Sequence, residues 1–429
     1  MFKSNNIIEI DKPCMSEQEF IEFILNRDYN ENMFNKDGTL NKNYNSSKVT
    51  GIISTILEDH SDEFFNEYGE QINKYRPNAY DEIKKVIDCH NKNLGCSLYQ
   101  CPSCGDIVFM GHTCKSRLCT SCGYKYKNER VENILETAYA CNHRQIVFTI
   151  PKKLRPFFYY PYEERIDILF EAVKDTIYSI LNLSYKKNKS GKTKEYKSKT
   201  KWLPGFFAFL HTFGRDLKWN PHIHVLIAEL KISGDKISKW NYFDYDALSK
   251  RFQKILLDLL SKRLDKNIFS NELKKELFLN HKNGFYVYAE PKKFKSLKDG
   301  VEYVTRYCGR PAISENRIIN YDGKNVTFCY NAHEDESYHE VTISAIEFIK
   351  LLIRHLVPFG FKTIRYYGFY RKKPSCFDKI NKLINKEKHS VRRTLLRHRL
   401  SIMESFNRDP YTCPRCGNML NYILEMTGG

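Results

Sequence analysis

The chain has 429 residues, and its content of 41% hydrophobic and 14% aromatic residues is enough for two or three domains with a sizeable core. No apolar run approaches the ~20 residues of a membrane span and the first residues lack an apolar signal segment, so we expect a cytoplasmic protein. Its excess of positive charge leads us to expect association with the nucleoid. The formal net charge of +18 favours a polyanionic partner over a membrane surface, for which there is no amphipathic anchor.

Hydrophobic periodicity predicts four regions along the chain. Apolar residues at three- and four-residue spacing make residues 1–80 a helical region, and a cysteine-rich zinc-binding domain follows over residues 81–130. Strands that alternate with helices predict an α+β catalytic domain, an antiparallel sheet with flanking helices, over residues 131–375. A basic C-terminal region occupies residues 376–429. We expect strands over 145–150, 206–210, 222–227 and 285–289, and helices over 124–139, 163–183, 246–264 and 297–308.

Two segments concentrate the positive charge. Residues 184–201 hold eight lysines and one acid, which predicts a flexible, solvated loop that is either a linker or a DNA contact. Residues 350–408 hold sixteen Lys or Arg against three Asp or Glu, which is +13 of the net charge. Aromatic residues interleave with this charge, as suits base stacking, and four of the basic residues are our expected DNA contacts. The aromatic residues are Tyr366, Tyr367, Phe369 and Tyr370, and the expected contacts are Lys372, Lys373, Arg392 and Arg393.

Paired cysteines predict structural zinc. The sequences Cys101-Pro-Ser-Cys104 and Cys119-Thr-Ser-Cys122 are separated by fourteen residues, and a glycine follows each pair, as tight knuckle turns prefer. Four thiolates at this spacing suit tetrahedral zinc, so we predict one zinc ion bound by Cys101, Cys104, Cys119 and Cys122.

Other cysteines and histidines leave alternatives open. One set either completes a second zinc site or only packs against its neighbours; it comprises Cys89, Cys96, His112 and Cys114. A third pair, Cys413 and Cys416, supplies only two ligands, so it forms a partial site completed from elsewhere, for example by His389 or His398, or no site.

A histidine pair marks a candidate catalytic centre. On a strand, His222 and His224 point to one face, where they either bind a common cation or stand as a surface pair. A hairpin turn centred on residues 217 and 218 would place His211 opposite His224 as a third ligand. An acidic or amide side chain from elsewhere is the alternative third ligand.

Tyrosines at helical spacing are the candidate nucleophiles. Tyr303 and Tyr307 lie four residues apart, on one face of a predicted helix with capping residues before it and Gly309 and Pro311 after it. Tyr366 and Tyr370 have the same spacing without helix signals, so we favour the first pair.

These motifs together resemble the insertion-sequence-ninety-one family of rolling-circle transposases, two-tyrosine members of the HUH endonucleases. The resemblance runs from about Cys89 to Cys416. It is carried by the segments 112–122, 147–151, 211–225 and 303–314. It implies that His222 and His224 bind Mg²⁺ or Mn²⁺, and that Tyr303 and Tyr307 attack single-stranded DNA of transposon ends and target. It also implies a 5′-phosphotyrosine with a free 3′-hydroxyl.

Two other functions also fit these motifs. The first is a replication initiator or relaxase with the same HUH chemistry, against which the zinc module before the histidine strand argues. The second is a non-catalytic, zinc-dependent DNA-binding regulator. The sequence lacks a GxxxxGK[ST] phosphate loop, as expected if covalent tyrosine linkage conserves the phosphodiester energy without ATP. It leaves the oligomeric state open.

Overall fold

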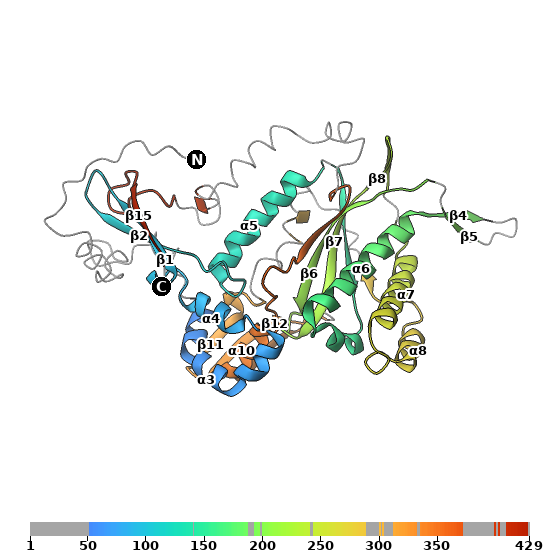
Figure 1. The fold of residues 1–429 in the computed structure, drawn as a ribbon, viewed down its shortest axis with the longest axis horizontal. Helices are drawn as coiled ribbons and strands as arrows, with labels where there is room; N and C mark the ends of the chain where they lie inside the picture. Colours follow the sequence, from blue (N-terminus) through green and yellow to red (C-terminus); the bar gives the residue numbers. More distant parts are fainter. Residues whose placement is uncertain are drawn as a thin grey trace.

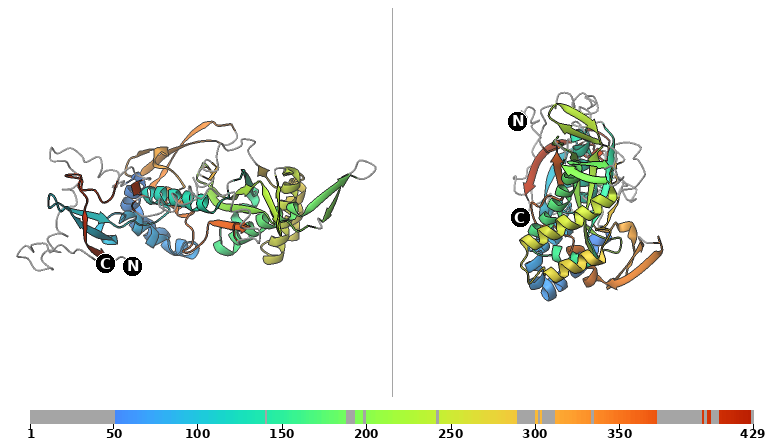
Figure 2. Two further views of the ribbon diagram at one scale, coloured as in Figure 1. Left: turned by 90° about the horizontal axis from the view of Figure 1, so that it is seen from above. Right: turned by 90° about the vertical axis from the view of Figure 1, so that its right-hand side faces the viewer.

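The protein is elongated, with a small sheet at one end and a hairpin at the other (Figures 1 and 2). The structure, a computed structural model, describes residues 51–139, 141–187, 193–197, 200–240, 243–288, 300–301, 303, 312–332, 335–371, 399, 402–403 and 409–427.

A five-stranded antiparallel sheet forms the centre of the molecule. Its strand order is β10-β3-β7-β6-β14, so the β6–β7 hairpin lies in its interior. This confirms the α+β fold with an antiparallel sheet. The four predicted strands are present as β3 (His143–Thr149), β6 (Gly205–Phe213), β7 (Trp219–Ala228) and β10 (Val287–Tyr288), and β10 is shorter than expected. The fifth strand, β14 (Ile364–Gly368), was not predicted.

Helices cover both faces of this central sheet (Figure 1). One face packs on α6 (Tyr162–Leu181) and α7 (Tyr245–Arg263), and α8 (Asn271–Asn280) and the 3₁₀ helix η3 (Lys152–Phe158) extend this core. The other face packs on α5 (Thr120–Thr137), whose apolar residues at 131, 134 and 135 recur at helical spacing. Strand residues alternate between the two cores, so neighbouring side chains on β7 have different surroundings.

A second body packs beside the central sheet. Helices α3 (Ile52–Tyr75) and α4 (Ala79–Ile87) share a core with α10 (Ala345–Ile353). A three-stranded sheet that our sequence analysis did not predict completes this core; its strands are β11 (Ile318–Tyr321), β12 (Asn325–Asn331) and β13 (Tyr338–Ser344), with η4 (Glu315–Arg317) before them. The helical character predicted for residues 1–80 is therefore present from residue 52, and residues 1–50 lie outside the described part.

The third sheet joins distant parts of the chain. Its order is β15-β1-β2, so β15 (Asn421–Thr427) pairs with β1 (Gly95–Gln100), and β2 (Ile107–Gly111) forms the other edge. The 3₁₀ helix η2 (Lys92–Leu94) precedes β1. Figure 1 shows β15 lying beside β1, far from the central sheet.

Two small hairpins complete the fold. β4 (Leu183–Lys187) and β5 (Thr193–Lys197) pair antiparallel. The prediction of a flexible loop over residues 184–201 is therefore wrong for the residues of these two strands. Their backbone groups form a continuous ladder from Leu183↔Lys197 to Lys187↔Thr193, a pairing that charge composition does not report. β8 (Leu230–Ser233) pairs with β9 (Lys236–Lys239). Within the described residues, no helix is both long enough and apolar enough to cross a membrane.

Candidate metal centres and tyrosine site

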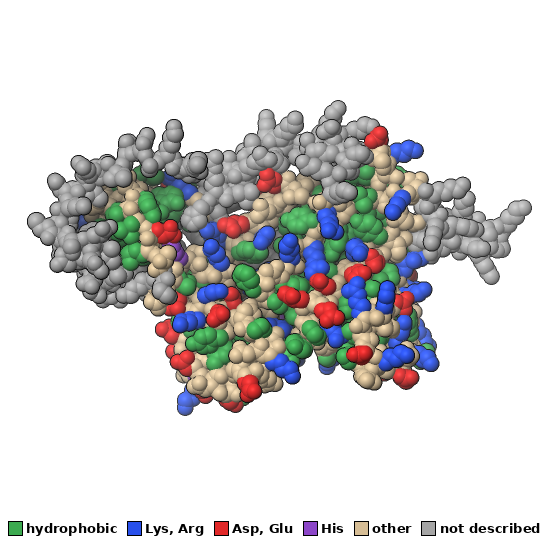
Figure 3. Space-filling model, viewed as in Figure 1, with side chains coloured by type: hydrophobic (Ala, Val, Ile, Leu, Met, Phe, Trp, Pro, Cys, Tyr) green, Lys and Arg blue, Asp and Glu red, His purple; other side chains and the backbone are tan. Residues whose placement is uncertain are grey.

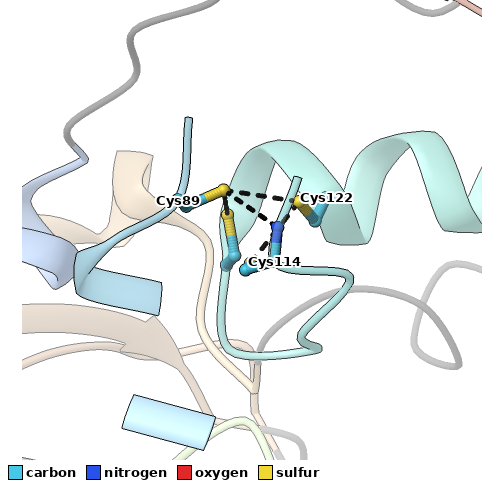
Figure 4. A group of neighbouring side chains, drawn as sticks. Cys89, Cys114 and Cys122 are labelled. Atoms are coloured by element: carbon cyan, nitrogen blue, oxygen red, sulfur yellow. Dashed lines mark hydrogen bonds between the residues drawn. The ribbon is translucent and has the colours of Figure 1, made fainter. Parts of the chain in front are cut away.

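The first cysteine cluster comprises Cys89, Cys114, Cys119 and Cys122. Cys89 follows α4, Cys114 lies in the loop before α5, and Cys119 and Cys122 lie at the start of α5. Figure 4 shows Cys89, Cys114 and Cys122 converging on one point. Their Sγ atoms lie 3.6 Å apart for Cys89–Cys122 and 3.5 Å for Cys114–Cys122, and Cys119 lies 3.7 Å from Cys89.

These spacings fit a tetrahedral zinc ion. Zn–S bonds of about 2.3 Å place the four sulfur atoms of a tetrahedral site roughly 3.8 Å apart, close to the observed 3.5–3.7 Å. Cys119 is the N-cap of α5, so the positive end of the helix dipole faces the thiolates. The donor set and its geometry are those of a closed structural site.

The second cysteine cluster comprises Cys101, Cys104, Cys413 and Cys416. The Sγ atoms of Cys101 and Cys416 are 3.3 Å apart, and those of Cys104 and Cys413 are 3.7 Å apart. All four ligand atoms lie within 4.8 Å of one another, as the four sulfur atoms of a tetrahedral zinc site do, so this site also suits zinc.

The two Cys-x-x-Cys knuckles of the second cluster, residues 101–104 and 413–416, have the same backbone turn. Gly105 and Gly417 have φ of +71° and +77°, and each donates its N–H over 2.9 Å to the carbonyl of the first cysteine of its knuckle. Both knuckles read Cys-Pro-x-Cys-Gly in sequence. This common pattern could have predicted from the sequence that the two knuckles form one site, but our sequence analysis did not use it.

The structure corrects the predicted zinc ligands. The pair Cys101–Cys104 and the pair Cys119–Cys122 do not form one site. Cys101 and Cys104 turn toward residues 413–416. Cys119 and Cys122 lie at the start of α5 and face Cys89 and Cys114. Gly123 lies within α5 and not in a knuckle turn.

The four residues that we proposed for a second zinc site do not form one site. Cys89 and Cys114 complete the first cluster, but Cys96 is buried on β1 and belongs to neither cluster. His112 instead bonds the carbonyl of Leu94 at 3.2 Å through Nδ1. His389 and His398, our candidate partners for the third knuckle, lie outside the described residues.

Three histidines meet on one face of the central sheet, which we call the histidine face. His222 and His224 come from β7 and His211 from the neighbouring β6. Their candidate ligand nitrogens all lie within 4.8 Å of one another. His211 and His224 are buried and His222 is half-buried, so the group opens to the surface at His222.

The hairpin register differs from the one we expected. His211 pairs with His222, and Phe209 pairs with His224. The turn is wider than a two-residue turn, since Gly214 bonds Lys218, and a bulge follows His211. The observed register therefore differs from the predicted pairing of His211 with His224 by two residues. A two-residue shift preserves the face of every side chain, which is why all three histidines still converge.

Hydrogen bonds orient the imidazoles. The Nδ1 atom of His222 lies 2.6 Å from the carbonyl oxygen of Asn220, so Nδ1 carries the proton and Nε2 keeps its lone pair for a cation. His224 contacts the side-chain amide of Gln145 through its Nδ1 at 2.9 Å. Burial, and then the neighbouring His211 and His222, hold the pKa of His224 well below its usual range, so its imidazole is neutral.

Gln145 is a site residue that sequence analysis missed. It lies on β3 within a predicted strand, but its place beside His224 depends on the β3–β7 register, where it pairs with Leu226. A strand prediction alone does not give that register.

Tyr303 packs on the histidine face. Residues 300, 301 and 303 are helical, as predicted. Val301 is buried and Tyr303 partly buried in the same core as Phe207, Phe209 and Leu226, which share the sheet face of the histidines. Tyr307 lies outside the described residues, so the position of the second phenol stays a prediction.

The alternative tyrosine pair has a structural role instead. Tyr366 lies on β14 and Tyr370 follows it, so they share no helix. Tyr370 is buried and its hydroxyl lies 2.6 Å from Nε2 of His143, whose Nδ1 bonds a backbone carbonyl. Tyr367 and Phe369 are also buried. The expectation that this aromatic run stacks on bases is therefore wrong for these three residues, because they fill the cores on both sides of β14.

The expected DNA contacts Lys372, Lys373, Arg392 and Arg393 lie outside the described residues. On the face drawn in Figure 3, the Lys and Arg side chains of the described residues are interspersed with Asp and Glu.

Comparisons with known proteins bear on this arrangement. A family model described as "Putative transposase" matches residues 205–376, and one described as "Transposase zinc-binding domain" matches residues 56–150. The transposase for insertion sequence element IS801 of Pseudomonas savastanoi pv. phaseolicola is 26% identical over 362 residues, which cover 81% of this chain and 84% of the relative. "Putative transposase y4qJ" of Sinorhizobium fredii is 27% identical over 335 residues, covering 72% of this chain and 79% of the relative. No solved structure matches the chain.

A zinc-binding match followed by a transposase match on one chain decides the family. The chain belongs to the insertion-sequence-ninety-one family of transposases. This confirms the resemblance drawn from the sequence motifs. The transposase carries structural zinc, because the zinc-binding match contains the whole first cysteine cluster and half of the second. As a transposase, it binds and cleaves DNA. The transposase match contains the three histidines.

Proposed function

We propose that this transposase cuts and rejoins single-stranded DNA by HUH chemistry, through a 5′-phosphotyrosine, in rolling-circle transposition. The observation that carries the proposal is the histidine face itself. Three imidazoles gather their ligand nitrogens within 4.8 Å, and Tyr303 packs on the same face of the sheet. A cation site and a nucleophile on one surface are the two parts that the chemistry needs.

The three histidines fit a divalent cation. His211, His222 and His224 would hold it through one nitrogen each, and water or DNA oxygens would complete the shell. Imidazole suits the transition metals, whereas Mg²⁺ prefers oxygen ligands, so the donor set favours Mn²⁺ over Mg²⁺. When bound, the cation supplies polarisation of the scissile phosphate and stabilises charge on the leaving oxygen.

The tyrosine does the covalent work. The Oη atom of Tyr303 bonds to phosphorus while the bond from phosphorus to the 3′-oxygen breaks, and the 3′-oxygen takes up a proton as the phenol loses its own to solvent. Attack by a second 3′-hydroxyl reverses these bonds, so no nucleotide cofactor is needed. Tyr307, one helical turn along the sequence, is the proposed second nucleophile. On charge alone, Lys372, Lys373, Arg392 and Arg393 are proposed DNA contacts.

A covalent-adduct assay tests the proposal. The protein is incubated with Mn²⁺ and single-stranded oligonucleotides that tile the DNA flanking its gene, and adducts are detected on denaturing gels. We expect an adduct with the wild type and none with Tyr303→Phe/Tyr307→Phe, because the variant keeps both rings and loses both attacking oxygens. Tyr366→Phe is the matched control, a partly buried tyrosine in the same core, and should form the adduct. An adduct with the double variant would contradict the proposal.

A histidine variant separates catalysis from binding. His222→Ala should lose adduct formation while binding a single strand nearly as well as the wild type, because phosphate contacts and not the cation supply most affinity. Equal loss of both activities would argue for a structural role of His222.

A further inference from the structure

Two exposed aromatic rings lie at the edge of the central sheet, Tyr288 on β10 and Tyr286 directly before it. Tyr286 is 57% exposed and Tyr288 is 43% exposed. Their rings are nearly parallel, with planes 19° apart and centroids 6.0 Å apart. Two large apolar side chains at a sheet edge form a flat surface that packing of the described residues does not bury.

Both rings lie on the histidine face. Phe285 and Val287 are buried in the core beneath α6 and α7, on the opposite face of the sheet. Val287 pairs with Phe148, which belongs to that same core. Successive side chains of a strand point to opposite faces, so Tyr286 and Tyr288 point to the face of His222 and His224.

The register places the rings level with the histidines. Tyr288 pairs with Val147, and Val147 pairs with His224. The amide of Thr149 donates to the carbonyl of Tyr286 at 2.9 Å, and Thr149 pairs with His222. Only β3 separates β10 from β7, so the two strands are roughly 10 Å apart at the usual strand spacing.

We propose that Tyr286 and Tyr288 form a stacking platform for the bases of the single strand whose scissile phosphate reaches the histidine face. The inference rests on the proposed function, since it names the path of that substrate. Aromatic rings stack on any base without reading its sequence. Bases stacked on these two rings would hold the DNA backbone next to the histidines, where the phosphate is cut. An exposed edge strand also pairs with strands of other protein chains. The oligomeric state of the leucine variant, described below, distinguishes that alternative from DNA binding.

Affinity for a single strand is the first test. Binding of the full-length protein to a fluorescent oligomer of twenty thymidines is measured by anisotropy. Tyr286→Leu/Tyr288→Leu should weaken binding by about tenfold, whereas Tyr286→Phe/Tyr288→Phe should stay within about twofold of wild type, because phenylalanine still stacks. Tyr338→Leu is the matched control, a 59% exposed tyrosine on β13, and should bind like wild type. Unchanged binding by the leucine variant would overturn the inference. So would a change in its oligomeric state with affinity unchanged.

Cross-linking on the unaltered protein avoids any question of folding. Oligonucleotides that form the adduct are made with one 5-iododeoxyuridine at successive positions, irradiated, and mapped by mass spectrometry. Cross-links to Tyr286 or Tyr288 from bases next to the cleaved bond are expected, and their absence from every position overturns the inference. If the wild type forms no adduct, the proposed function fails whatever the leucine variant does. If the adduct forms and these tyrosines neither cross-link nor contribute affinity, the platform alone fails.

Discussion

Ligation by His224 requires a specific arrangement of Gln145. A neutral imidazole that binds a cation through Nε2 carries its proton on Nδ1, and that atom faces the Gln145 amide at 2.9 Å. Only the amide oxygen accepts this proton. With the amide nitrogen toward His224, the Gln145 oxygen is buried without a hydrogen-bond partner. Exchanging the two amide atoms satisfies the oxygen and frees Nε2, so we expect Gln145 to present its oxygen.

Gln145 should therefore act as a positioning residue for the cation. Gln145→Leu removes the acceptor and should weaken Mn²⁺ binding about 10- to 100-fold, whereas Gln145→Glu keeps an acceptor and should retain it. Mn²⁺ binding is followed by electron paramagnetic resonance of the free ion, without reference to DNA cleavage. Gln253→Leu is the control, a buried glutamine that bonds the carbonyls of Leu277 and His281. Equal Mn²⁺ affinity in the leucine and glutamate variants would refute this role.

At the scale of elements, two different local structures form the two cysteine clusters, and we expect each cluster to bind one zinc ion. The first cluster uses the start of a helix, and the second uses two knuckle turns. Zinc content measured on purified protein should be two ions per chain. Cys104→Ser and Cys114→Ser should each lower it to one, because each removes one ligand from a different cluster. Cys96→Ser changes a cysteine that is buried outside both clusters and should keep both ions. A single variant that loses both ions would show that the sites are not independent.

The elements that sequence predicted are those with strong local patterns. Helix α5 and the β6–β7 hairpin follow from apolar spacing, and the common face of the histidines depends only on a period of two. The register of His211 depends on the bulge after it, and the partner of Cys101 lies 315 residues away in sequence. Such long-range pairings are set by tertiary packing, so the local pattern of neither segment contains them. The same reason explains why Gln145 and the β11–β13 sheet were missed.

At the scale of the whole molecule, the second cysteine cluster joins residues 101–104 to residues 413–416, which lie far apart in sequence. Strand β15 pairs with β1, and the second cysteine cluster lies at the end of the same small sheet. Its core is limited to a few residues, mainly Cys101, Val108, Cys413 and Leu420, so we expect zinc to supply stability that apolar burial cannot. The basic stretch between β14 and β15 is thereby attached at one end to the central sheet and at the other to this zinc-bound sheet.

Loss of the second zinc should open this sheet and leave the catalytic sheet intact. Cys413→Ser/Cys416→Ser removes two of four ligands, so β15 should detach from β1 and leave its amides without partners. Hydrogen exchange read by mass spectrometry should accelerate in peptides over residues 95–100 and 421–427. Peptides of β3, β6 and β7 should exchange as in the wild type, because their hydrogen bonds and core are separate. Cys329→Ser, in β12, is the control and should leave both sheets protected. If exchange rises equally in the central sheet, the zinc-bound sheet is not an independent unit, and the second zinc stabilises the whole chain.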